Sequence, residues 1–127
     1  YEEYSSDTDF TQKSVSKEFS LYDISMNEQI IIRTLYRREL YGLAIQEHIK
    51  KASNNEIDLN PGSLYPALRR LEKKGLVKCR WGEQIPKARR GARRKYYALT
   101  CEGEKMFREI ENFVDRLRNN RPVHKLN

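Results

Sequence analysis

The chain has 127 residues, enough for one compact domain that buries roughly two thirds of its extended-chain surface. Its 25 Lys and Arg residues against 18 Asp and Glu give a formal net charge of +7, and it lacks the run of about eighteen apolar residues that a membrane-spanning helix requires. The polar, acidic start is unlike a secretory signal, and the two cysteines lack CxxC spacing, so we expect a cytoplasmic protein with reduced thiols rather than a disulfide framework.

The first 24 residues differ in charge from the remainder of the chain. They contain six acidic and two basic residues, a balance of −4, which leaves +11 for residues 25–127. They also show no sustained hydrophobic period, so we expect an acidic N-terminal arm followed by a basic domain. A basic domain favours a polyanionic partner, either nucleic acid or an anionic membrane surface.

Two helices are predicted after the arm. The stretch SMNE is a capping box in which Ser25 and Glu28 satisfy the first free amides of a helix. After a break near residues 39–40, the stretch YGLAIQEHIKKAS at 41–53 predicts a second helix. The alternating EIDL at 56–59 predicts a short edge strand. The expected buried side of the second helix consists of Leu43, Ala44, Ile45 and Ile49.

A third helix is predicted within NPGSLYPALRRLEKKGLV at 60–77. Asn60 is a suitable N-cap, and Pro61 suits the first helical position because its missing N–H would be unpaired there anyway. Gly75 is placed to end the helix in a left-handed conformation. The stripe predicted to be buried consists of Leu64, Ala67, Leu68 and Leu71. The start and outward side are small and basic, and their candidate binding residues are Gly62, Ser63, Tyr65, Arg69, Arg70 and Lys73.

Two strands are predicted at 76–81 and 94–99, joined by a polar loop too long for a tight hairpin. We interpret Trp81 as a core anchor, with a place in a small-molecule pocket as the alternative. The loop should project as a flap, because it has little apolar content to bury. Its basic residues, together with those leading into the second strand, are Lys87, Arg89, Arg90, Arg93, Arg94 and Lys95.

The final helix is predicted to follow an N-cap at Thr100 and to end near residue 118. Apolar residues recur on it at spacings of three and four, as in a short coiled-coil seam. They exceed what one helix needs to cover its own domain, so we expect a dimer interface. Its candidate residues are Met106, Phe107, Ile110, Phe113, Val114 and Leu117.

The predicted order of elements is that of a winged helix. The expected fold class is mainly α with a small β-hairpin: a winged helix-turn-helix followed by a C-terminal dimerisation helix. The third helix would enter the major groove of DNA, and the arginines of the flap would follow the backbone or the minor groove. The expected boundaries are 1–24 for the arm, 25–100 for the winged helix, 101–118 for the dimerisation helix and 119–127 for the tail.

Four stretches resemble the PadR-type transcriptional regulators. They are YGLAIQEHI at 41–49, NPGSLYPALRRLEKKGLV at 60–77, Trp81 and RRKYYALTCEG at 93–103. The resemblance implies a homodimeric DNA-binding repressor with its recognition helix at 61–74 and its wing at 82–93. It also implies DNA contacts from Tyr41, Ser63, Tyr65, Arg69 and Lys95. The acidic arm and the Arg-rich wing depart from the family pattern, and together they are similar to a cyanobacterial regulator of the circadian clock, which implies a clock-gene promoter as the target.

A winged helix can instead serve as a protein-interaction or RNA-binding module, because a fold does not determine a function. Enzyme activity is not expected, since a glycine-rich phosphate loop, GxSxG and HExxH are all missing from the sequence. His48 and His124 have no carboxylate or thiol at ligand spacing, so we expect neither a metal nor a cofactor. The expected partners are double-stranded DNA and a second copy of the chain, and nothing in the sequence supports a small-molecule effector.

Overall fold

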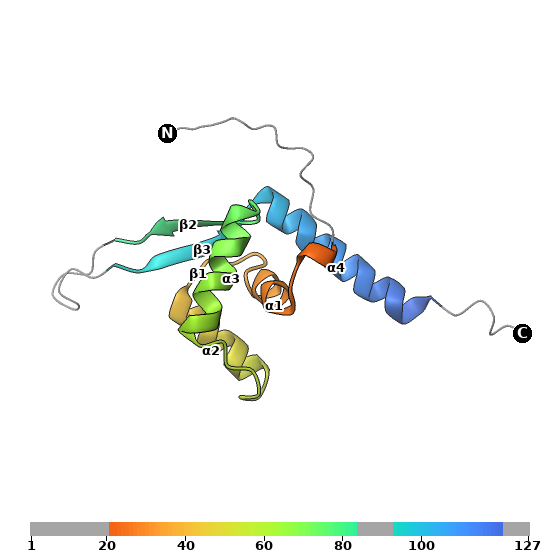
Figure 1. The fold of residues 1–127 in the computed structure, drawn as a ribbon, viewed down its shortest axis with the longest axis horizontal. Coiled ribbons are helices and arrows are strands. Elements are labelled where there is room, and N and C mark those ends of the chain that lie inside the picture. Colours follow the sequence, from red (N-terminus) through yellow and green to blue (C-terminus); the bar gives the residue numbers. More distant parts are fainter. Residues whose placement is uncertain (1–20, 84–92, 121–127) are drawn as a thin grey trace, which may run out of the picture.

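The computed structural model describes residues 21–83 and 93–120, and Figure 1 shows how their helices and strands are arranged. Helices α1, α2 and α3 form the body, a hairpin of β2 and β3 extends from one side, and α4 extends past α1 on the other. The elements are η3 (Leu21–Asp23), α1 (Met26–Thr34), β1 (Leu40–Tyr41), α2 (Gly42–Ala52), α3 (Pro61–Lys73), β2 (Val77–Trp81), β3 (Lys95–Leu99) and α4 (Cys101–Asn119). This is the expected winged-helix order with a long C-terminal helix.

The helix ends are formed by the residues that the sequence predicts. The Ser25 hydroxyl accepts from the Glu28 amide while the Glu28 carboxylate accepts from the Ser25 amide, which completes the capping box. Asn60 caps α3 directly before Pro61, and the Thr100 hydroxyl caps α4. Gly75 has a φ of 77°, a left-handed conformation that ends α3.

The sheet has three antiparallel strands in the order β1-β3-β2. The prediction of a strand at 56–59 is wrong, because the third strand is β1, where Leu40 pairs with Tyr97 and Tyr41 with Tyr96. At the predicted position the Ile57 amide instead donates to the Ser53 hydroxyl, which closes the turn after α2. A two-residue strand leaves no alternation in a sequence, so only its position beside β3 reveals it.

The core lies where α1, α2 and α3 meet beneath the sheet. Its fully buried side chains include Ile31, Leu35 and Ile45 together with the predicted stripe of α3. The prediction that Leu43 belongs to this core is wrong, because 53% of its surface is exposed. Leu43 occupies the first turn of α2 and points toward the hairpin rather than toward α1.

Helix α4 divides into a part that packs on the domain and a part that does not. Met106 and Ile110 are buried in the common core, and the Phe107 ring stacks on Tyr36, in the turn after α1, at 3.8 Å between centroids. Further along, Val114 still packs against the core, but Phe113 and Leu117 are 40% and 65% exposed. Among the described residues, no helix combines the length and apolar character needed to cross a membrane.

Candidate nucleic-acid interface

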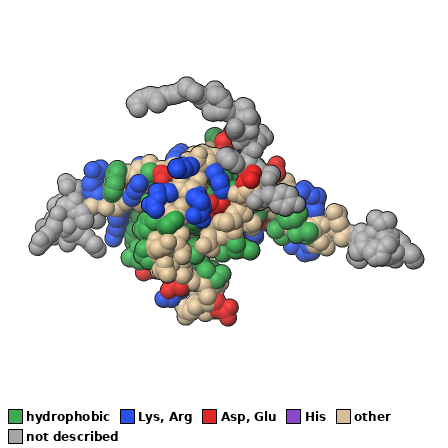
Figure 2. All heavy atoms as spheres, in the orientation of Figure 1, with side chains coloured by type: hydrophobic (Ala, Val, Ile, Leu, Met, Phe, Trp, Pro, Cys, Tyr) green, Lys and Arg blue, Asp and Glu red, His purple; other side chains and the backbone are tan. Residues whose placement is uncertain are grey.

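A hollow of about 620 Å³ lies between α3 and the hairpin. Six of the predicted binding residues line it: Tyr41, Tyr65, Arg69, Arg93, Arg94 and Lys95. Figure 2 shows Lys and Arg side chains gathered over the hairpin and α3 on one face of the molecule. The third helix and the base of the predicted flap therefore contribute to a single cationic surface, although they are separated by more than twenty residues in the sequence.

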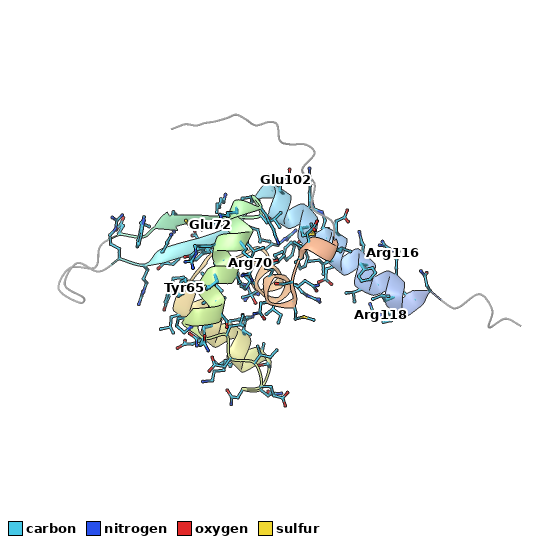
Figure 3. All side chains as sticks on the ribbon, in the orientation of Figure 1. Tyr65, Arg70, Glu72, Glu102, Arg116 and Arg118 are labelled. Carbon is cyan, nitrogen blue, oxygen red and sulfur yellow. The ribbon has the colours of Figure 1, made fainter. Side chains whose placement is uncertain are left out.

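The N-terminal half of α3 reaches the hollow through Tyr65. In Figure 3 Tyr65 and Glu72 lie on the side of α3 that is turned to the hairpin. A Cβ atom on Gly42 would lie 2.0 Å from the Tyr65 hydroxyl oxygen, so only glycine at the start of α2 lets the ring lie where it does. The ring is 37% exposed and forms one wall of the hollow.

Arg94 lies just beyond the outermost pair of the hairpin, and an aromatic pair restricts its side chain. Its guanidinium lies 4.4 Å from the centre of the Tyr41 ring, which meets the Tyr96 ring edge-on at 5.6 Å. Arg80 in turn lies 4.9 Å from the centre of the Tyr96 ring and forms two 2.8 Å hydrogen bonds to Glu39. Such cation–π contacts restrict a long side chain before any ligand arrives.

Trp81 is not the core anchor that the sequence suggested. Its side chain is 54% exposed, and the guanidinium of Arg93 and the ammonium of Lys95 each lie 5.6 Å from its ring. The reason is its register: Trp81 pairs with Lys95 at the outer end of the hairpin, whereas α3 covers the inner pair of Cys79 and Tyr97. A strand can keep its alternation of side-chain directions and still extend past the helix that covers it, which leaves its last apolar residue exposed.

Glu72 connects α3 to the hairpin beneath the hollow. The Cys79 thiol donates a 2.8 Å hydrogen bond to the Glu72 carboxylate. Burial, reinforced by this hydrogen bond, raises the pKa of Cys79, so the sulfur remains a protonated thiol at neutral pH. Burial also raises the pKa of Tyr97 to about 12. Both groups are packing contacts rather than reactive groups.

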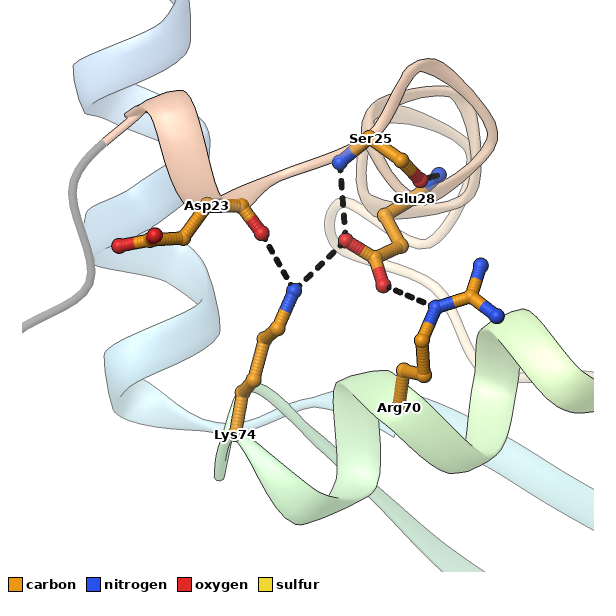
Figure 4. Close-up of polar contacts among 5 residues, drawn as sticks. All are labelled: Asp23, Ser25, Glu28, Arg70 and Lys74. Atoms are coloured by element: carbon orange, nitrogen blue, oxygen red, sulfur yellow. Dashed lines mark hydrogen bonds and ion pairs between the residues drawn. The ribbon is translucent and has the colours of Figure 1, made fainter.

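Arg70, one of the predicted binding residues, has an internal partner. Its Nε donates to Glu28 at 2.7 Å, and Lys74 donates to the other oxygen of the same carboxylate at 2.8 Å (Figure 4). Burial opposes ionisation of Glu28, but the hydrogen bonds from Lys74, the Ser25 amide and Arg70 outweigh it and hold the pKa of the carboxyl below 4.5. Arg70 thus joins α3 to α1 and does not line the hollow.

The other predicted residues lie at the ends of α3 or outside the described segments. Gly62 and Lys73 are exposed, and the Ser63 amide donates to the Asn60 cap. Lys87, Arg89 and Arg90 fall outside the residues that the structure describes. Five residues of the hollow were not predicted as binding residues: Gly42, Leu43, Glu72, Trp81 and Tyr97. Trp81 was one of the residues that resemble the PadR-type regulators, and a place in a pocket was the alternative to its interpretation as a core anchor.

Comparison with known proteins gives a consistent result. The model of the family described as "Transcriptional regulator PadR-like family" matches residues 31–109. An uncharacterised protein from Lysinibacillus sphaericus is 30% identical over 83 residues, which cover 65% of this chain and 72% of the relative.

Solved structures share the fold. The X-ray structure of a PadR-like transcription factor from Bacteroides fragilis is 30% identical with a TM-score of 0.65, and the match covers 80% of this chain and 90% of that one. The structure of Bacillus subtilis PadR in complex with operator DNA is 24% identical with a TM-score of 0.58, covering 76% of this chain and 49% of that one. At 24% identity, the similarity to Bacillus subtilis PadR shows only that the two proteins share a fold.

Proposed function

Since this chain belongs to the PadR-like family of transcriptional regulators, we propose that it binds double-stranded DNA as a homodimeric repressor of a promoter. The observation that carries the proposal is the hollow, in which Arg69 of α3 and Arg93, Arg94 and Lys95 of the hairpin lie together beside exposed aromatic rings. In a winged helix this surface faces the major groove and the adjacent backbone. Among the described residues that line the hollow, Glu72 is the one carboxylate that opposes its positive charge.

Dimerisation is proposed to use the outer part of α4. Phe113 and Leu117 are exposed there and Val114 is half-buried, so an apolar strip continues past the domain's own core. Met106 and Ile110 are already buried within one chain and support α4 rather than the partner. A twofold dimer would present two recognition helices to an inverted repeat, about 34 Å or one helical turn apart.

The promoter is proposed to belong to a circadian clock gene, on the sequence resemblance alone, and the protein to act in the cytoplasm on nucleoid DNA. A footprint on genomic DNA fragments would identify the operator and its half-site spacing. Reporter expression from that promoter, with and without the protein, distinguishes repression from activation.

DNA binding is tested by removing the cations of the hollow. The triple variant Arg69→Ala, Arg93→Ala and Arg94→Ala should lower affinity for a duplex at least a hundredfold, because three charge-assisted phosphate contacts are lost. The matched control is Lys50→Ala, Lys51→Ala and Lys105→Ala, which removes the same charge from exposed sites on α2 and α4. Equal losses in the two variants, or no loss in either, would favour a protein-interaction or RNA-binding module instead.

A further inference from the structure

Three apolar side chains interrupt the cationic lining of the hollow. Leu43, Tyr65 and Trp81 are among the seven large apolar side chains that the described part of the chain exposes, and all three line this one hollow. Single exposed apolar residues are ordinary on a protein surface. A surface that contacted only phosphates would not require three exposed apolar side chains among its four cations.

Trp81 is the most exposed of the three and is firmly positioned. It forms the outermost pair of the hairpin with Lys95, and the next residue, Gly82, donates its amide to the Arg94 carbonyl at 2.6 Å. The Gly82 carbonyl in turn accepts from Arg93 Nε at 3.1 Å. The backbone that carries the indole ring is therefore held in place, and the cations of Arg93 and Lys95 lie near the ring.

An aromatic ring with two cations beside it matches the chemistry of a DNA backbone. Along each strand, apolar deoxyribose C–H groups alternate with anionic phosphates, so a ring can cover a sugar while flanking cations meet the neighbouring phosphates. The four cations of the hollow make duplex DNA the occupant whose charge is complementary.

We propose that Trp81 is a DNA-contacting residue whose ring is covered by a deoxyribose of the backbone, with Arg93 and Lys95 held beside it for the adjacent phosphates. The proposal rests on DNA binding as the function. The contact of the Trp81 ring with DNA would add an apolar contribution to the binding free energy. Salt does not screen this contribution, because burial of the ring releases no counterions.

Trp81 is the one tryptophan of the sequence, so intrinsic tryptophan fluorescence reports on this side chain alone. The wild-type protein is titrated with a duplex of about 30 base pairs, three helical turns, at low salt. Anisotropy of a labelled duplex measures binding, and acrylamide quenching of tryptophan emission with the unlabelled duplex measures access to Trp81. We expect saturating DNA to protect the emission from acrylamide severalfold.

Substitution separates an apolar contact from a charge contact. Trp81→Ala should weaken binding about tenfold or more without changing the slope of log K against log salt, whereas Lys95→Ala should make that slope shallower by about one. Met26→Ala is the matched control, because Met26 is exposed and lies outside the hollow. Urea unfolding verifies that each variant is folded.

The outcomes separate this inference from the proposed function. If wild-type protein raises the anisotropy while tryptophan emission stays equally open to acrylamide, Trp81 is not a contact and the inference is overturned, although DNA binding stands. The same conclusion follows if a folded Trp81→Ala variant binds as tightly as wild type. If wild-type protein leaves the anisotropy unchanged, DNA binding itself fails.

Discussion

At the scale of single residues, Glu28 is the side chain with the most demanding surroundings. It is 1% exposed, and its carboxylate accepts hydrogen bonds from Arg70, Lys74 and the Ser25 amide. A buried charge is stable only when such partners replace its lost hydration. One carboxylate thereby starts α1 and fixes the C-terminal half of α3 against it.

Glu28→Gln should lower the free energy of unfolding at pH 7 by about 3 kcal/mol, since Lys74 and Arg70 lose their shared counter-charge and Arg70 is partly solvated. The folded-state pKa of Glu28 lies below 4.5, so this contribution is complete at pH values above that and is lost as pH falls through the folded-state pKa. Urea unfolding of wild type and variant should therefore show a difference that is constant near neutrality and shrinks in acid.

The control for this prediction is Glu111→Gln. Glu111 pairs with Arg33 at 3.0 Å on the partly exposed surface between α1 and α4, where an ion pair contributes less than about 1 kcal/mol. Equal effects of the two substitutions, or a Glu28→Gln effect that persists unchanged in acid, would show that the buried carboxylate does not have the role described.

At the scale of elements, the shape of the hollow depends on how closely α2 approaches α3. Gly42 begins α2, and the Tyr65 hydroxyl of α3 occupies the space that any larger residue would need. The far end of a tyrosine can move at little cost to the fold. The close approach therefore matters for where Tyr65 lies in the hollow more than for stability.

Gly42→Ala should change stability by no more than about 1 kcal/mol, because alanine's better helix propensity offsets the displacement of Tyr65. DNA affinity should fall about tenfold, equivalent to 1.4 kcal/mol, as the ring leaves its place. A double-mutant cycle with Tyr65→Ala is the decisive measurement: in that background Gly42→Ala should have no further effect on affinity. Additive losses would mean that Gly42 does not act through Tyr65.

At the scale of the whole molecule, the hairpin and α4 extend from opposite sides of the helical body (Figure 1). The Arg33–Glu111 ion pair attaches α4 to α1, and the Tyr36–Phe107 stack attaches it to the turn that follows α1. In a dimer formed through α4, these contacts would determine how far apart the two DNA-facing surfaces lie. The outer turns of α4 remain uncovered within one chain.

Phe113→Asp combined with Leu117→Asp should convert the protein to single chains in sedimentation, because two charges would be buried in the proposed interface. The fold should survive, since both side chains are exposed; Ile110 is unsuited to this test because it is buried in its own core. If the dimer contacts about eight phosphates, the slope of log K against log salt should change from roughly −7 to about half that value. A variant that still sediments as two chains would contradict an interface on this part of α4.

Local rules in the sequence were enough to predict most of the elements. The capping box at Ser25, the Asn60–Pro61 start of α3, the left-handed Gly75 and the Thr100 cap each act within four residues, so the sequence alone determines them. Tertiary structure decided what depends on distant neighbours. Strand β1 exists because β3 lies beside it, and Arg70 faces Glu28 because α1 crosses that side of α3.

The candidate site divides in the same way. Residue type and order predicted that Arg69, Arg93, Arg94 and Lys95 would be basic surface residues, but only the packing of the hairpin against α3 shows that they line one hollow. The exposure of Trp81 and Leu43 likewise could not be predicted from the sequence. An apolar residue in a regular pattern is buried only where another element covers it. Pattern determines which face of an element is apolar, and the path of the rest of the chain determines whether that face is covered.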